Sequence, residues 1–215
     1  MKKIFMFVVM PIIIVVLGYL IYSSVQEPVI FEKQKKFREG VCIERLKVIR
    51  TLQVAYKTKY GKFTGGMDTL INFYNNDRIT VIRQIGSMDD SLAVAQKRVF
   101  RDSIKIAVKD TLLKKEIQAG LVIDSIAYIP FSGKQKMMMS AIVKKVSGVD
   151  VPLFEAYAPY DILLQGLNRQ LIVNLKADRN AMNKYEGLKV GSVDSPNNNA
   201  GYRDWETFQI GRAHV

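Results

Sequence analysis

The sequence predicts an α+β fold, in which an N-terminal transmembrane helix and a long amphipathic helix precede a mostly antiparallel sheet. Three observations support this class: an uncharged apolar segment at the N-terminus, apolar residues at helical spacing after it, and short β-branched or alternating runs in the second half. Helices that come first and strands that follow are typical of α+β proteins. We therefore expect a membrane anchor at 1–24, one domain at 25–200 and a separate tail at 201–215.

The anchor is predicted from an uncharged stretch that runs from Ile4 to Tyr22 and whose partner is the lipid bilayer. At about 1.5 Å per residue, this stretch is just long enough to cross a hydrocarbon core of about 30 Å. It is longer than the apolar core of a typical signal peptide, and no A-x-A pattern follows it. Lys2 and Lys3 favour a cytoplasmic N-terminus. We expect an uncleaved single-pass anchor, with a cleaved signal peptide as the alternative.

A long helix is predicted at about 28–60, because apolar residues recur there close to a period of 3.6 and charged residues fill the other face. The apolar positions are Val41, Leu46, Ile49, Leu52, Tyr56 and Tyr60. Pro28 is expected at the start of this helix and Gly61 just after its end. A short second helix is expected at about 67–75.

The sheet is predicted at about 100–195, where short runs rich in β-branched residues alternate with Gly, Pro, Ser and Asp clusters. The expected strands are 104–109, 121–129, 137–146, 151–157 and 171–175. Residues 91–100 link the helices to the sheet, and their pattern fits either a helix or a strand.

Charge and cysteine content restrict the partners. The formal net charge is +12, but Lys and Arg are spread along the chain and do not alternate with aromatic residues, so no nucleic-acid partner is expected. The densest basic run is Lys33, Lys35, Lys36 and Arg38, shortly after the anchor. The single cysteine, Cys42, cannot form an intrachain disulfide or a paired-cysteine zinc site, and its helical spacing among apolar residues predicts a packing role.

No catalytic, cofactor-binding or metal-ligating residue is predicted, and the chain is not expected to be an enzyme. The run from Gly61 to Gly66 lacks the spacing of a phosphate-binding loop, and Ser132 lies in no G-x-S-x-G elbow. Three consecutive methionines end at Met139, but neighbouring residues of a strand point to opposite faces and do not converge on one ion. The acidic residues lack the spacing of a calcium loop.

The stretch from Gln209 to Val215 resembles the translation of a sequencing-library adapter. It holds the single histidine, His214, and the single tryptophan, Trp205, lies shortly before it. Segments of this kind are excluded from fold reasoning, so residues 201–215 are assigned to no domain.

The segment from Leu46 to Phe63 resembles the end of a pseudopilin helix, where an I-R-x-x-Q-x-A-Y-like stretch runs into a G-K/R-Y/F turn. The order of elements is also similar to type IV pilins and pseudopilins, whose apolar N-terminal segment leads into an amphipathic helix that docks on an antiparallel sheet. The resemblance implies a helical stretch of roughly fifty residues that begins in the membrane. This chain differs from that family where Gly18 lies inside the apolar segment and no Glu precedes Glu27.

These observations predict a membrane-anchored structural or assembly protein of the cell envelope. We expect a pilin-like or secretion-apparatus component that contacts other envelope proteins or other copies of itself. The alternative is a membrane-tethered module that binds a glycan or lipid, which requires a concave apolar pocket. The expected location is the bacterial inner membrane, with a cytoplasmic N-terminus and a periplasmic domain.

Overall fold

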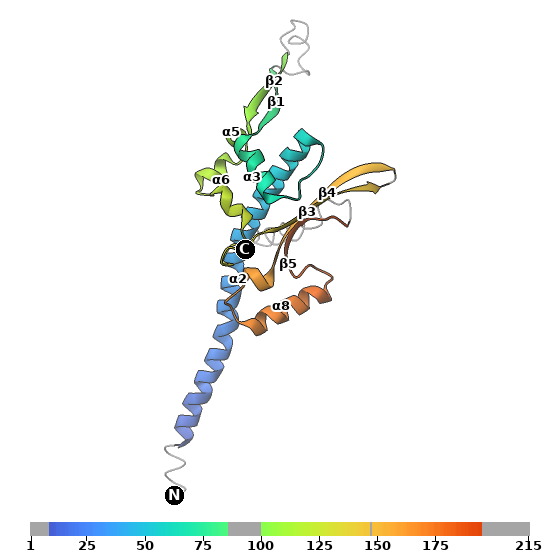
Figure 1. Ribbon diagram of the computed structural model, residues 1–215. Coiled ribbons are helices and arrows are strands. Elements are labelled where there is room, and N and C mark those ends of the chain that lie inside the picture. Colours follow the sequence, from blue (N-terminus) through green and yellow to red (C-terminus); the bar gives the residue numbers. More distant parts are fainter. Residues whose placement is uncertain (1–8, 86–99, 147, 195–215) are drawn as a thin grey trace, which may run out of the picture.

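The computed structural model describes residues 9–85, 100–146 and 148–194, and it has an α+β fold, as the sequence predicts (Figure 1). Helix α2 (Met10–Tyr60) runs through the molecule, and the other elements surround its C-terminal half. The shorter helices are α3 (Met67–Asn76), α5 (Val108–Thr111), α6 (Lys114–Gln118), the 3₁₀ helix η2 (Ile123–Ala127), α7 (Tyr160–Leu163) and α8 (Arg169–Ala181).

Two antiparallel sheets take the place of the single sheet that the sequence predicts. The first pairs β1 (Arg78–Ile85) with β2 (Phe100–Ala107). The second has the order β3-β4-β5 and consists of β3 (Met138–Val146), β4 (Val149–Pro159) and β5 (Gly187–Gly191). The long helix packs on the second sheet through contacts with β4 and β5, so the predicted helix-on-sheet arrangement is confirmed there.

Helix α2 is one uninterrupted helix of 51 residues. The predicted start of a separate helix at Pro28 is wrong, because Pro28 lies inside α2. An interior proline removes the helical bond to the carbonyl four residues earlier, here that of Ser24, and its ring presses against that carbonyl, at a cost of about 3 kcal/mol. No glycine lies between Gly18 and Pro28, so the surrounding turns favour helix and α2 continues across this position.

Helix α2 ends where the sequence predicts. Gly61 has a left-handed backbone with φ of 73°, and its N–H donates to the carbonyl of Lys57 at 2.8 Å. A residue with a Cβ is strained in this conformation, which is why glycine commonly follows the last helical turn. The predicted second helix is confirmed as α3, with Leu70 and Phe73 buried.

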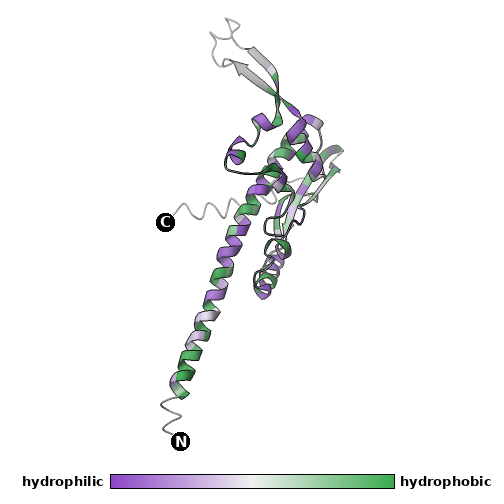
Figure 2. Cartoon of the chain, turned by 60° about the vertical axis from the view of Figure 1, so that its left-hand side comes forward, coloured by the Kyte–Doolittle hydropathy of each residue, from purple (hydrophilic) through white to green (hydrophobic). Residues whose placement is uncertain are grey.

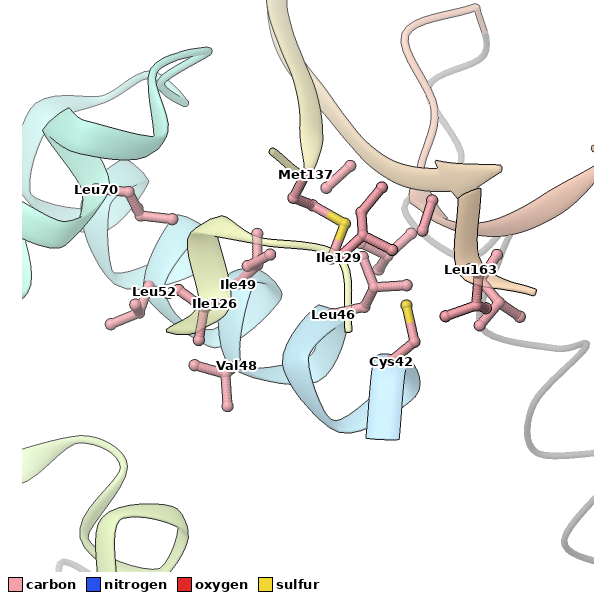
Figure 3. Packing of buried hydrophobic residues seen from close by; sticks show 14 of the residues in the cluster. Cys42, Leu46, Val48, Ile49, Leu52, Leu70, Ile126, Ile129, Met137 and Leu163 are labelled. Atoms are coloured by element: carbon pink, nitrogen blue, oxygen red, sulfur yellow. The ribbon is translucent and has the colours of Figure 1, made fainter. Parts of the chain in front are cut away.

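The core lies along the C-terminal half of α2. Leu46, Ile49 and Leu52 are fully buried, as the apolar stripe predicts, whereas Tyr60 at its end is exposed. In Figure 3, Leu46 points toward Ile129 and the start of β3. The stripe therefore packs on the loop before β3 and on the sheet, and it sets the position of the domain on the helix.

The strand prediction for 121–129 is wrong, because most of this run forms η2. Ile123 and Ile126 are spaced three residues apart, and a 3₁₀ helix places such residues on one side. Ile126 and Ile129 are buried in the core, and Ile123 packs against it. In this segment, burial against α2 therefore outweighs the β-propensity of the isoleucines.

The strand prediction for 171–175 is also wrong, because these residues form part of α8. The side-chain oxygen of Asn168 accepts hydrogen bonds from the backbone N–H groups of Gln170 and Leu171, at 2.8 and 3.2 Å. Such a cap satisfies two of the free N–H groups of the first turn and fixes a helix start. Ile172 is the residue of α8 that is buried in the core.

The other predicted strands agree with β2, β3 and β4, except that Val108 already begins α5. Strands β1 and β5 were not expected. In β5, a Cβ on Gly187 would collide with the carbonyl of Ala158, and a Cβ on Gly191 would collide with the carbonyl of Phe154. Close packing on β4 therefore requires glycine at both positions, although glycine has a low β-propensity. Residues 91–99, whose pattern fits either a helix or a strand, lie outside the described residues.

The buried stripe of α2 is tested by comparing Leu52→Ala with Val54→Ala in the full chain in detergent. Leu52 is fully buried and Val54 is 52% exposed on the same helix. We expect Leu52→Ala to lower the free energy of unfolding by about 2–5 kcal/mol, because it leaves a cavity in the core. Val54→Ala is expected to change it by no more than about 0.5 kcal/mol. Denaturant unfolding followed by circular dichroism measures both, and equal effects would contradict the packing of α2.

Candidate functional site: an apolar helix end and an aromatic patch

The N-terminal part of α2 is apolar and uncovered. Every side chain from residue 10 to residue 30 is exposed. The most apolar 18-residue window of this helix has a mean hydropathy of 1.6, and none of it is buried. By length and composition the helix can cross a membrane, and Figure 2 shows its lower end as the most continuous apolar stretch of the molecule. Exposed apolar surface on this scale marks a contact with a membrane or another protein.

The folded domain meets α2 just beyond this apolar part. Phe31 is the first buried residue of the helix in chain order. One turn earlier, the amide of Asn168 donates a hydrogen bond to the Glu27 carboxylate at 2.7 Å. The helix therefore passes from a fully exposed part to a domain-bound part over little more than one turn.

Two arginines of α2 hold loops of the domain against the helix. Arg38 donates to the carbonyls of Leu163 and Gln165 at 3.2 and 2.8 Å. Arg45 donates to the carbonyls of Ser125 and Tyr128 at 2.8 and 2.6 Å. Charged donors give stronger hydrogen bonds than neutral ones, so each guanidinium fixes one loop end.

A carboxylate and a phenol meet under the α2–α7 junction. The Tyr160 hydroxyl, which is almost fully buried, donates to Glu39 at 2.6 Å. Burial raises the pKa of the Glu39 carboxyl above its ordinary value, although the hydrogen bond from Tyr160 acts in the opposite direction. The Arg179 guanidinium lies 5.5 Å from the centre of the Tyr160 ring. These groups are fully engaged with one another, and their arrangement is that of a buried structural tie.

The turn after α2 is fixed by a buried glutamine. Gln53 donates to the Thr64 carbonyl at 2.6 Å and accepts from the Thr64 N–H at 3.1 Å. Its amide also donates to the sulfur of Met139 at 3.1 Å. The run from Gly61 to Gly66 is therefore a turn docked on α2 and β3, in agreement with the sequence interpretation.

An exposed aromatic pair lies beside α2, and we call Phe37, Phe131 and Arg38 the aromatic patch. The rings of Phe37 and Phe131 are 5.7 Å apart, and the Arg38 guanidinium lies 5.2 Å from the centre of the Phe131 ring. Phe37 is 61% exposed and Phe131 is 48% exposed. Phe131 also has a φ of 62°, which is unusual for a bulky side chain and costs about 1–2 kcal/mol.

Ser132, the consecutive methionines and Cys42, which were considered above for chemistry, serve in turns and in core packing. The Ser132 hydroxyl donates to the Ile129 carbonyl and accepts from the Gln135 N–H, so it closes a turn. Met137 is buried whereas Met138 is exposed, so the methionines do not converge. Cys42 is fully buried, as predicted, and burial raises the pKa of its thiol to about 12. Over the described ranges, no group of three metal-ligating side chains comes together.

A shallow hollow on α2 is lined by residues of this one helix, namely Pro28, Val29, Glu32, Lys33 and Lys36. A single helix face cannot enclose a ligand on several sides, and ligand pockets are usually concave. This hollow therefore does not supply the pocket that the ligand-binding alternative requires. His214 and Trp205, the single histidine and the single tryptophan of the chain, lie outside the described residues.

Neither a family model, nor a curated protein, nor a solved structure matches this chain. The role of each surface described above is therefore inferred from its geometry. Sequence reasoning located the apolar helix end but missed the aromatic patch, since Phe37 and Phe131 are 94 positions apart by their numbering. The sequence of the Pro130–Gly133 region predicts a turn, but it does not indicate which helix this turn contacts.

The buried Glu39 is tested by its effect on stability against pH. Because its pKa is raised in the folded state, the proton on Glu39 stabilises the fold. This contribution is complete below the unfolded value of about 4.3 and is lost as the pH rises through the folded value. We expect Glu39→Gln to remove the part of the decline in unfolding free energy that this carboxyl causes as the pH rises above about 4.3. Glu44→Gln, at an exposed position of the same helix, controls for the loss of one carboxylate. Identical profiles for Glu39→Gln and the wild type would contradict the burial.

The strained backbone of Phe131 is tested by comparing Phe131→Gly with Phe131→Ala. Both variants lose the ring, but glycine adopts positive φ freely. We expect the glycine variant to be more stable than the alanine variant by about 1–2 kcal/mol. At Gln135, which has no positive φ, the order should reverse. Unfolding by denaturant measures all four variants, and an alanine variant at 131 as stable as the glycine variant would rule out the strain.

Proposed function

We propose that this protein is a single-pass membrane protein of the cell envelope that acts as a structural or assembly component. In this proposal the apolar end of α2 crosses the bilayer and the domain contacts other proteins. One observation carries it: α2 exposes residues 10–30, which are uncharged as far as Gln26 and mostly apolar, and builds the domain core with its other end. A helix that is apolar all round is stable in a bilayer, whereas water disfavours it.

The continuous helix would fix the height of the domain above the membrane. From Tyr22 to Leu46 the helix rises about 36 Å at 1.5 Å per residue. No loop intervenes, and the domain is tied to α2 through Arg38, Arg45 and the Glu39–Tyr160 hydrogen bond. Such a protein holds a contact surface at a defined distance from the bilayer, which suits an assembly role.

The aromatic patch is the contact surface that fits this role best. Aromatic residues, phenylalanine among them, and arginine are enriched at protein interfaces relative to the rest of the surface. Lys134 and Lys136 follow Phe131 closely and are exposed, so the rim is basic. Charge complementarity favours a partner that presents an apolar side chain among acidic residues. A second copy of the chain would bring the same basic rim against itself.

The pilin-like or secretion-apparatus role rests on the order of the elements and on the pseudopilin-like stretch from Leu46 to Phe63. Placement in a bacterial inner membrane, with the N-terminus in the cytoplasm and the domain in the periplasm, rests on Lys2 and Lys3 before the apolar stretch.

Membrane integration is tested by fractionation, alkaline extraction, protease protection and intact mass of the protein expressed in a bacterial host. We expect a full-length, membrane-integral chain whose domain is digested only when the periplasm is opened. Val16→Lys should release part of the protein, because a lysine at the centre of a spanning helix costs about 2.5–3.5 kcal/mol. Val54→Lys, at an exposed position of the domain part, is the matched control. A shortened soluble species would refute the anchor.

A further inference from the structure

One side of α2 carries a glycine in the middle of the helix. Gly40 is exposed, its φ is not positive, and a Cβ built on it would meet no atom within 4 Å. Glycine is among the least favourable residues in a helix interior. No contact among the described residues requires glycine at this position, so the missing side chain leaves the helix backbone open on its outer side.

Gly40 belongs to a row of exposed residues, which we call the outer stripe of α2. Residues three or four positions apart lie on one side of an α-helix. The outer stripe consists of Val29, Lys33, Lys36, Gly40 and Glu44, and all five are exposed. It is about 22 Å long at 1.5 Å per residue. The shallow hollow described above lies at its N-terminal end, so the domain does not cover the stripe there.

The aromatic patch forms a wall beside the outer stripe. Phe37 precedes Gly40 by three positions, and its ring centre is 5.7 Å from that of Phe131. Both rings are exposed, although the backbone of Phe131 is strained, with a φ of 62°. An apolar side chain that approaches the open backbone at Gly40 therefore meets the Phe37 ring as well.

The surface around the stripe and the aromatic patch is basic. Lys33, Lys134 and Lys136 are exposed, and among the described residues no carboxylate lies within ion-pair distance of them. Arg38 donates to backbone carbonyls, which leaves its positive charge uncompensated by a carboxylate. These four charges attract a partner that carries carboxylates on the facing surface.

The carboxylates of the same segments are mostly engaged. Glu44 pairs with Lys47 at 3.0 Å, and Glu32 lies within ion-pair distance of two lysines, at 2.8 and 3.7 Å. Glu39 accepts a hydrogen bond from the buried phenol of α7. Within the described ranges, Asp124 of η2 is exposed and has no ion-pair partner. Four unpaired cations against this one carboxylate leave the surface positive.

We propose that the outer stripe and the aromatic patch together receive a helix of another protein, whose apolar side chain packs against Gly40 and Phe37 and is flanked by carboxylates. Helix axes pack about 8–10 Å apart, and a glycine allows the short end of this range. A second copy of the chain would set the same lysines against one another, which disfavours self-association. The inference rests on the proposed function and names the chemistry of the partner.

The test uses the full chain in neutral detergent micelles and a stapled helical peptide of about five turns as the probe. The staple is needed because short isolated helices are marginally stable in water. The peptide carries a leucine at its centre, with glutamates one turn before and after it. A second peptide has glutamine in place of every glutamate. Fluorescence anisotropy of a label on the peptide measures the dissociation constant.

We expect the glutamate peptide to bind about tenfold more tightly than the glutamine peptide, as several weak surface ion pairs add up. This difference should disappear at 1 M salt, where the screening length falls to about 3 Å. Lys33→Glu should weaken binding of the glutamate peptide and leave binding of the glutamine peptide unchanged.

The role of the open backbone is tested by comparing Gly40→Leu with Thr51→Leu. Thr51 is exposed on the same side of α2, beyond the outer stripe. Leucine favours helix over both residues, so both variants should raise the denaturant midpoint of unfolding. Only Gly40→Leu should weaken peptide binding, by about tenfold or more, because its side chain keeps the two helices apart.

Each other outcome overturns a part of the proposal. Absence of binding, or unchanged binding to Gly40→Leu, would overturn the docking surface, and equal binding of the two peptides would overturn the acidic partner. Self-association that Gly40→Leu abolishes, measured by analytical ultracentrifugation, would assign the stripe to a second copy. Alkaline extraction of the same variants separates this proposal from the proposed function. Gly40→Leu should stay membrane-integral, whereas release of the wild type would overturn the anchor itself.

Discussion

The structure depends on the unbroken backbone hydrogen bonding of α2, which joins an apolar segment to the core of a folded domain. The two halves of this helix have different surroundings. Residues 10–30 have no covering side chains, whereas Leu46, Ile49 and Leu52 are fully buried. Pro28 lies between the halves without ending the helix. The position of every other element is therefore defined relative to one axis.

The domain is attached to this axis by apolar packing and by a few strong polar ties. Met137 and Ile129 lie against Leu46 (Figure 3). Two arginines of α2 hold backbone carbonyls of two separate segments, one at Gln165 and one at Tyr128. Apolar packing supplies most of the stabilisation, while the directional bonds select one arrangement of the loops. The same ties hold Phe131 on the surface of α2, where its strained backbone is compensated by contacts with Phe37 and Arg38.

Local signals of the sequence, namely hydrophobic periodicity, β-branched runs and the glycine at position 61, predict the apolar helix, the buried stripe, the end of α2 and strands β2 to β4. The failures have a common cause in tertiary packing. The isoleucines before Tyr128 have β-propensity, but their three-residue spacing fits a 3₁₀ helix packed on α2. The sequence around Leu171 predicts a strand, but the Asn168 cap starts a helix there, because its side-chain oxygen accepts a hydrogen bond from the Leu171 N–H. Strand β5 contains two glycines that are chosen by close backbone contact with β4, which propensity cannot anticipate. The aromatic patch brings together distant residues, so only the fold reveals it.

The most direct test of this account is the distance between two spin labels on α2, at Val15 and Val54, measured by pulsed electron spin resonance in the full chain. Both side chains are exposed. One continuous helix places these positions about 58 Å apart along its axis, with a narrow distribution. A shorter and broad distribution would mean that the chain bends at Pro28 and that the apolar segment and the domain move independently.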